Sequence, residues 1–175
     1  MRICAYFYSV KQYESDTILM LGGNLGDVKS NFEVALSKLG NEKGSIYKQS
    51  SLYQSDPWGD TDQPPFLNQA IWYKTSLSAE NLLEMVLEIE NEMGRVRNRK
   101  NGPRTMDIDI LLIDNQVFNT NKLTIPHPRM HLRRFNMMPL MELIPDWIHP
   151  VLGKNISELM NLCTDETAVF KINNK

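Results

Sequence analysis

The sequence predicts an α+β domain in which two helices cover one face of an antiparallel sheet. Short apolar or β-branched runs give four strands, and two stretches with 3.6-residue apolar periodicity give two helices. Their order along the chain is strand, helix, strand, strand, helix, strand. This βαββαβ order is the ferredoxin-like pattern, followed here by an added hairpin and C-terminal helices. We expect the other face of the sheet to carry loops and a ligand.

The composition is that of one soluble globular domain, with 175 residues, 42% hydrophobic content and a formal net charge of −2. We predict a single domain over residues 1–175, with an N-terminal extension at 1–17 and the main domain at 18–160. The small net charge excludes an overall basic coat for nucleic acid. No apolar run approaches the roughly 18 residues of a membrane span. Because Cys4 and Cys163 form neither a zinc pattern nor a disulfide framework, we expect a cytoplasmic protein.

The extension contains an apolar, aromatic run at residues 3–10. No small-x-small cleavage site follows this run, and Lys11, Glu14 and Asp16 come instead. An extra edge strand, a disordered tail or a misassigned start codon therefore explains the extension better than a secretion signal.

The first strand begins at residues 18–21 and leads into a glycine-rich turn at 22–27. This turn lacks the Lys-Ser/Thr of a phosphate-binding P-loop, so its glycines are expected to allow a tight strand-to-helix connection. Asp27 caps the following helix, whose apolar residues lie within 32–39 and which Gly40 ends.

Residues 46–53 and 67–75 are predicted to form the second and third strands. The connecting loop, residues 55–65, contains three prolines and an exposed-looking tryptophan. Residues 79–93 show a clear apolar helical period and stop at a glycine, which predicts the second helix.

After the fourth strand, a turn leads into residues 117–118, which we expect to pair back as a hairpin. Prolines on both sides of His127 fix an extended segment. A helix with methionines as core filler is predicted at residues 132–143, where Pro139 either kinks the helix or marks its start. Residues 155–162 are predicted to form a last helix.

The other elements are arranged around the turn and strand at residues 102–114, GPRTMDIDILLID. Asp107 and Asp109 are two residues apart on a strand, so their side chains leave the same face, about 6.5 Å apart along the chain. Ile108 and Ile110 then enter the core. The alternative without a functional site is a solvated basic loop followed by a strand with an acidic end. Acids on an otherwise apolar strand need partners, which favours a functional site.

The chain just before this strand is basic and contains no acid between residues 94 and 104. Arginine side chains bind phosphate oxygens with two parallel hydrogen bonds. Mg²⁺ usually takes one or two carboxylates together with water and substrate phosphates. A basic loop that leads into paired aspartates therefore predicts a metal–polyphosphate site. The cations of this loop are Arg95, Arg97, Arg99, Lys100 and Arg104.

Six blocks of sequence occur in a characteristic order and spacing. They are LGGNLGD at 21–27, SLY at 51–53, FLN at 66–68, GRVR at 94–97, GPRTMDID at 102–109 and IPHP at 125–128. These blocks resemble the 6-hydroxymethyl-7,8-dihydropterin pyrophosphokinase family of folate biosynthesis, whose fold is the ferredoxin-like arrangement. The likeness runs from residue 18 to residue 150, and the GPRTMDID block is the most specific.

The resemblance implies transfer of the terminal pyrophosphate of ATP to the hydroxymethyl group of the pterin, with release of AMP. Asp107 and Asp109 would hold two Mg²⁺ ions, and Arg95 and Arg104 would act with them in catalysis. The other residues implied in ATP binding are Arg97, Ile110, Lys122, Thr124, His127 and Arg133. Those implied in pterin binding are Ser55, Asp56, Trp58, Phe66, Asn68 and Phe135, with Phe66 and Phe135 stacking on the two faces of the ring.

Some positions depart from well-known members of the family. Asn101 stands where an aromatic residue is frequent, and Lys122 where an arginine is common. Pro128 and Trp58 also replace other residues. These changes bear on loop dynamics and nucleotide affinity, not on the reaction. We expect the loop from residue 94 to residue 102 to be mobile without ligand and ordered with ATP.

Two other functions compete with this interpretation. A nucleic-acid-binding module would use the basic loop for phosphates and the aromatics for bases, but Asp107 and Asp109 would repel the backbone. A different Mg²⁺-dependent phosphotransferase on the same fold is separated only by substrate testing. We expect ATP and the pterin as partners, no nucleic acid or membrane, and a monomer or weak dimer.

Overall fold

The computed structural model describes residues 14–40, 43–59, 61–95 and 102–172. Its elements in chain order are β1 (Ser15–Gly23), α1 (Val28–Leu39), β2 (Gly44–Gln49), β3 (Tyr53–Ser55), β4 (Phe66–Thr75), α2 (Ala79–Glu92), β5 (Asp107–Ile113), β6 (Phe118–Asn119), β7 (Thr124–Ile125), the 3₁₀ helix η1 (Met130–Leu132), α3 (Arg134–Leu143), α4 (Ile156–Leu162) and β8 (Val169–Lys171). The predicted α+β class is confirmed. Within the described ranges, no helix has the length and apolar character needed to cross a membrane.

The main sheet is antiparallel at every strand pair and has the order β5-β1-β4-β3-β8, with β2 also paired to β4. Strand β1 lies between β4 and β5, and its residues Ile18, Leu19, Met20 and Leu21 are at most 3% exposed. Burial on both faces explains why this strand appears in the sequence as a continuous apolar run.

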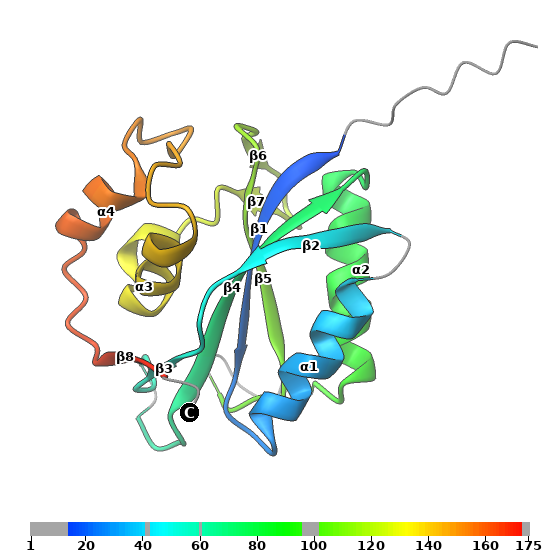
Figure 1. The fold of residues 1–175 in the computed structure, drawn as a ribbon, viewed down its shortest axis with the longest axis vertical. Coiled ribbons are helices and arrows are strands. Elements are labelled where there is room, and N and C mark those ends of the chain that lie inside the picture. Colours follow the sequence, from blue (N-terminus) through cyan, green and yellow to red (C-terminus); the bar gives the residue numbers. More distant parts are fainter. Residues whose placement is uncertain (1–13, 41–42, 60, 96–101, 173–175) are drawn as a thin grey trace, which may run out of the picture.

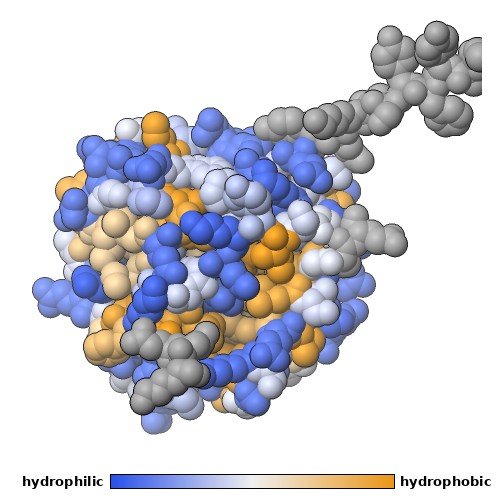
Figure 2. All heavy atoms as spheres, viewed as in Figure 1, coloured by the Kyte–Doolittle hydropathy of each residue, from blue (hydrophilic) through white to orange (hydrophobic). Residues whose placement is uncertain are grey.

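Helices cover both faces of the sheet, with α1 and α2 on one side and α3 and α4 on the other (Figure 1). Leu19 and Leu21 pack in the core under α1 and α2, whereas Ile18 and Met20 pack in a second core with Met137 of α3. The expectation of an open second face is therefore wrong, because the methionine-rich helix covers it. On the face seen in Figure 2, hydrophilic side chains cluster in the middle, between hydrophobic areas to the left and right.

The cap predicted at Asp27 is confirmed at the first helix, and the second helix has a cap that was not predicted. The Asp27 carboxylate accepts a hydrogen bond from the Ser30 backbone N–H at 3.1 Å, and Gly40 follows the last turn of α1. The Ser78 hydroxyl caps α2 in the same way, accepting from the Asn81 N–H at 3.2 Å. These local signals fix where both helices begin and so how their apolar sides meet the sheet.

The single strand predicted at residues 46–53 is two strands, β2 and β3. Its ladder with β4 is interrupted at Ser50, whose hydroxyl accepts the Ala70 backbone N–H at 3.0 Å. A serine side chain that bonds a neighbouring backbone group in this way competes with regular sheet pairing. Strand β3 resumes at Tyr53 and continues toward the cavity described below.

The predicted hairpin with the fourth strand is also wrong, because β6 pairs with β7 in a separate two-stranded sheet. The chain leaves β5 at Asp114, which adopts a left-handed conformation with φ 42°. The Asp114 side chain also accepts the Asp16 backbone N–H at 2.9 Å, which anchors this turn against β1.

Three further differences concern boundaries. Pro139 lies inside α3, so it does not mark the start of that helix. Residues 15–17, assigned to an extension, form the first three positions of β1. Strand β8, beyond the predicted domain end at residue 160, pairs with β3. Its three residues are too few to give a period that the sequence could reveal.

Candidate active site

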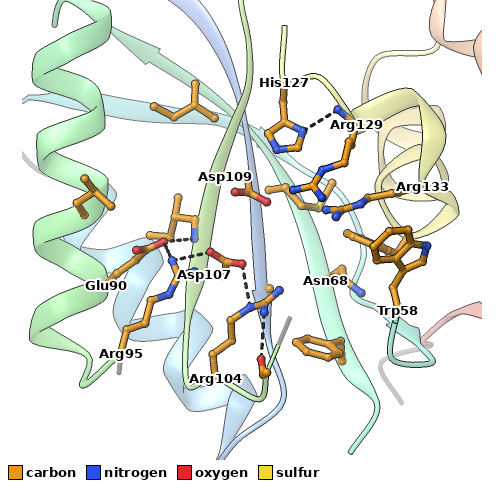
Figure 3. A pocket seen from close by; sticks show the side chains of 18 of the residues that line it. Trp58, Asn68, Glu90, Arg95, Arg104, Asp107, Asp109, His127, Arg129 and Arg133 are labelled. Carbon is orange, nitrogen blue, oxygen red and sulfur yellow. Dashed lines mark hydrogen bonds and ion pairs between the residues drawn. The ribbon is translucent and has the colours of Figure 1, made fainter. Parts of the chain in front are cut away.

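A cavity of about 1270 Å³ lies where β5 begins, between α2 on one side and the N-terminus of α3 on the other (Figure 3). Every predicted site residue in the described part of the chain lines this one cavity. They are Ser55, Asp56, Trp58, Phe66, Asn68, Arg95, Arg104, Asp107, Asp109, Ile110, Lys122, Thr124, His127, Arg133 and Phe135. Arg97 and the expected mobility of its loop lie outside the described residues.

Asp107 and Asp109 project from β5 into the cavity, while Ile108 between them joins the core under α1 and α2 (Figure 3). This is the same-face arrangement that the sequence predicted. In the sheet register, Gly22 of β1 lies directly between Asp107 and Asn68 of β4. Because glycine has no side chain, the floor of the cavity stays open between a carboxylate and an amide.

A β-bulge in β5 ties His127 to the aspartate strand. The register between β1 and β5 shifts between Ile18 and Leu19, which leaves Leu111 without a partner on β1. The His127 backbone N–H donates to the Leu111 carbonyl at 2.9 Å. The segment that carries His127 therefore lies along β5, and its imidazole reaches the cavity.

Two arginines hold the Asp107 carboxylate, which is 9% exposed. Arg95 Nη1 lies 2.6 Å from Asp107 Oδ1, and Arg104 Nε lies 2.8 Å from Oδ2 in an ion pair. Arg104 also donates from Nη1 to the Gly102 carbonyl at 3.1 Å. Both guanidinium groups are thus concentrated at the start of β5, beside the space where a polyphosphate would lie.

Asp109 has different surroundings. Among the described residues, none forms a hydrogen bond or ion pair with its carboxylate. Burial, and then the neighbouring Asp107 carboxylate, raise the pKa of Asp109 well above its usual range. A partly buried carboxylate without a protein partner is suited to receive a cation from solvent.

His127 is neutral in this setting. Burial, followed by the nearby charges of Arg133 and Arg129, lowers the pKa of His127 to about 4. The Arg129 backbone N–H approaches His127 Nδ1 at 3.3 Å, so the other ring nitrogen is available to a ligand (Figure 3). Arg129 also lines the cavity and was not among the predicted site residues.

Glu90 of α2 is the most deeply placed acid that the sequence analysis missed. It is 2% exposed, accepts the Ile108 backbone N–H at 2.8 Å and forms an ion pair with Arg95 Nη1. Glu90 thereby links α2, the start of β5 and a predicted catalytic arginine. Glu90 lies on the same side of α2 as the buried apolar residues, and this position was the available signal in the sequence. Buried glutamates are almost always paired with another group.

Asn24 joins three loops at the rim of the cavity. Its side-chain oxygen accepts the Arg104 backbone N–H at 2.9 Å. Its side-chain amide donates to Gln63 Oε1 at 3.0 Å and to the Pro64 carbonyl at 2.9 Å. The glycine-rich turn therefore positions Arg104 and the proline-rich loop, rather than binding phosphate itself.

The cavity has an apolar compartment on the α2 side of β5. It is lined by Leu83 and Leu87 of α2, Ile110 of β5, Leu123 and Thr124. Because β5 is an edge strand, the cavity reaches both faces of the sheet at this point. Apolar walls with few polar groups are typical of sites for flat heterocyclic ligands.

A second compartment beside α3 is aromatic. Arg133 lies between two rings, with its guanidinium carbon 4.7 Å from the Trp58 centroid and 5.4 Å from that of Phe135. Arg104 lies 4.9 Å from the centroid of Phe66. The Asn68 amide donates to Ser55 Oγ at 3.0 Å, which leaves its carbonyl oxygen for another donor. The charged groups of Asp107 and Asp109 thus stand between two ligand-sized compartments.

Comparisons of the sequence with known proteins identify the same family. The sequence model described as 7,8-dihydro-6-hydroxymethylpterin-pyrophosphokinase (HPPK) matches residues 18–145. A 2-amino-4-hydroxy-6-hydroxymethyldihydropteridine pyrophosphokinase of Synechocystis is 38% identical over 156 residues, covering 89% of this chain and 79% of the relative. A Bacillus subtilis protein of the same name is 44% identical over 126 residues, covering 71% and 75%.

The fold is also similar to solved structures. A Plasmodium falciparum HPPK-DHPS crystal structure with pteroate aligns with a TM-score of 0.70 at 17% identity. The alignment covers 91% of this chain and 45% of that longer chain. At this identity the likeness concerns the fold alone.

Proposed function

The chain belongs to the 7,8-dihydro-6-hydroxymethylpterin-pyrophosphokinase family, and we propose that Asp107 and Asp109 mark the point where pyrophosphate is transferred. The reaction transfers pyrophosphate from ATP to hydroxymethyldihydropterin in folate synthesis. The observation that carries this proposal is the pair of carboxylates on one face of β5, in a cavity with arginines on both sides. The two compartments that flank the carboxylates match the two heterocyclic substrates.

The residues present fit a magnesium site. Asp109 has no protein partner in the described chain, and Asp107 is two residues away on the same face. One or two carboxylates are the usual protein ligands of Mg²⁺, with substrate phosphates and water completing its shell. Two Mg²⁺ ions on these carboxylates would neutralise charge on the triphosphate and polarise the phosphorus under attack.

The arginines supply the fixed positive charge. Arg95 and Arg104 are already held at Asp107, so they need little reorganisation to meet a phosphate. Arg133 and the neutral His127 line the opposite wall and can donate to other phosphate oxygens. In phosphoryl transfer the protein mainly positions the reactants and neutralises developing charge, which is what this arrangement does.

The residues that line the two compartments support a placement of the two substrates. We place the adenine of ATP against Ile110 and the leucines of α2, with Thr124 and Lys122 beside the nucleotide. We place the pterin between Phe66 and Phe135 in what we call the pterin slot, with the Asn68 amide at its edge.

Ser55, Asp56 and Trp58 also line the pterin slot. With the two substrates placed on either side of the aspartates, the hydroxymethyl oxygen would face the β-phosphorus, in the position required for in-line displacement of AMP.

Location and assembly also remain proposals. We propose a cytoplasmic monomer or weak dimer, which the free thiol of Cys163 fits. The single-domain assignment with an N-terminal extension is likewise a proposal. The matching family model and the curated relatives are pyrophosphokinases, which favours the enzyme over the nucleic-acid-binding alternative.

Chromatography of one reaction mixture tests the reaction centre. With ATP, Mg²⁺ and reduced 6-hydroxymethylpterin, the chain should release AMP and form a pterin diphosphate, because we place the β-phosphorus of ATP at the charge cluster. Release of ADP would indicate a kinase that acts on the γ-phosphate, and unchanged ATP would indicate a binding protein. The same assay with Asp109→Asn separates transfer at this cavity from a contaminating activity.

A further inference from the structure

The walls of the proposed pterin slot come from segments that are far apart in the chain. One wall is the N-terminal turn of α3 with Arg133 and Phe135, and the other is the end of β3 with Ser55 and Asp56. Figure 1 shows that the chain after α4 runs alongside α3 and ends at β8 next to β3. This C-terminal segment, residues 163–172, therefore touches both walls.

The end of the segment is fixed to β3. Val169 and Ser55 are partners in the antiparallel ladder. The ladder is extended at both ends, because the Asp56 N–H donates to the Ala168 carbonyl at 3.2 Å and the Ile172 N–H donates to the Leu52 carbonyl at 2.8 Å. Ser55 in turn accepts the hydrogen bond from Asn68, so β8 supports the polar edge of the slot.

The start of the segment is fixed to α3. The N-cap residue of α3, Arg133, provides no side-chain cap, although helix N-termini normally need one. Asp165 supplies the missing acceptor, since its Oδ2 receives the Arg134 backbone N–H at 2.8 Å. The other oxygen, Oδ1, accepts the Thr167 N–H at 3.0 Å and the Thr167 hydroxyl at 2.5 Å.

The two attachments are only a few residues apart. Asp165 accepts a hydrogen bond from α3, and Ala168 accepts one from Asp56, the residue after β3. Thr167 donates to Asp165 and so stabilises the turn between these two contacts. A short segment with both ends hydrogen-bonded has little freedom to change its length. A displacement of one wall relative to the other must therefore break one of these bonds.

We propose that residues 163–172 form a brace that sets the width of the pterin slot, and that Asp165 is its positioning residue. Asp165 acts through Arg134, which lies between Arg133 and Phe135 in the first turn of α3. The proposal rests on the proposed function, because it takes Phe135 and the Ser55 wall as the pterin slot. Asp165 touches neither substrate and is not a catalytic residue.

The test compares Asp165→Ala with Asp165→Asn, and with Glu166→Ala as a matched control at the adjacent exposed acid. Asp165→Ala should raise KM for the pterin about tenfold, since small misplacements of binding groups cost up to about a hundredfold. KM for ATP should rise by less, at most about threefold, because the adenine compartment lies beside α2 and Arg133 is the one proposed nucleotide contact near the displaced turn of α3. Asp165→Asn keeps an acceptor for Arg134 and should bring KM for the pterin back to within about threefold of the parent.

If Asp165 served only to stabilise α3, Asp165→Ala would lower the melting temperature without raising KM for the pterin more than KM for ATP. An unchanged pterin KM in Asp165→Ala, or the same change in Glu166→Ala, would overturn the brace. If Asp165→Ala does not fold, Thr167→Val provides a milder test, because it removes only the hydroxyl bond to Asp165 and should still raise KM for the pterin selectively.

A Phe135→Ala variant separates this proposal from the one on which it rests. If Phe135→Ala leaves the pterin KM unchanged, the assignment of the pterin slot is wrong and the brace is overturned with it. If Phe135→Ala raises the pterin KM but Asp165→Ala does not, only the brace is wrong.

Discussion

Asp107 and Asp109 leave the same face of β5, yet among the described residues only Asp107 forms ion pairs, with Arg95 and Arg104. Asp109 faces the cavity without a hydrogen bond or ion pair from any described residue, and its pKa is raised by burial and by Asp107. Asp107 therefore holds the two arginines, and we propose that Asp109 receives the cation. This division of roles underlies the predictions below.

Arg104→Ala should reduce turnover about a thousandfold, the size of effect seen for arginines that stabilise phosphoryl transfer. The fold should persist, because Asn24 holds the backbone of residue 104 through hydrogen bonds to both its N–H and its carbonyl. Steady-state kinetics and thermal melting measure the two effects. Lys154→Ala, at an exposed loop position, is the control. A large loss of melting temperature with unchanged turnover would give Arg104 a structural role.

Glu90→Ala should destabilise the chain by about 3 kcal/mol, because removal of one member of a buried ion pair leaves the other charge uncompensated. It should also slow turnover, since Arg95 loses the carboxylate that orients it. Urea denaturation and initial rates measure these effects. Glu88→Ala lies on the exposed side of the same helix and should change neither. Equal behaviour of the two variants would contradict the role given to Glu90.

The sequence predicted the parts of this molecule that depend on local chemistry. Caps at Asp27 and Gly40, the alternation around Asp107 and the helical period of α2 are set by neighbours in the chain. Phe66 and Asn68 could be assigned to the site only through the family resemblance, because packing alone explains either residue equally well.

The structural predictions were wrong where contacts between residues far apart in the sequence decide the structure. Ser50 interrupts a strand through its bond to Ala70, and Asp114 directs the chain away from a hairpin through its contact with Asp16. The covering of the second face by α3, and the pairing of β8 with β3, also depend on partners that no sequence window contains.

Trp58 should report pterin binding by fluorescence. Its ring is 38% exposed and lies over the Arg133 guanidinium, so a pterin in the slot would change its surroundings. The measurement requires Trp58 as the only tryptophan, with Trp72→Phe and Trp147→Phe. Titration with the pterin in the presence of a non-hydrolysable ATP analogue should change the emission. A Trp58→Phe chain that retains the other two tryptophans is the control, and an equal change there would place Trp58 outside the slot.

His127 should contribute a specific pH dependence to stability. Its pKa is lowered from 6.5 to about 4, so between these values the unfolded chain binds a proton that the folded chain does not. Stability is therefore retained above pH 6.5 and lost as the pH falls toward 4. His127→Asn should lose less stability than the parent between pH 7 and pH 4.5, as measured by urea denaturation at each pH. Parallel losses in both chains would mean that His127 is not buried in its neutral form.

We propose that the carboxylates of Asp107 and Asp109 hold the metal ions of the reaction. Equilibrium dialysis with Mn²⁺ and a non-hydrolysable ATP analogue counts the ions bound per chain directly. The account predicts two ions per chain, with fewer in Asp109→Asn and a turnover reduced at least a hundredfold in that variant, as expected for loss of a metal ligand. A folded Asp109→Asn chain that still binds two ions and retains the parent turnover would contradict the account.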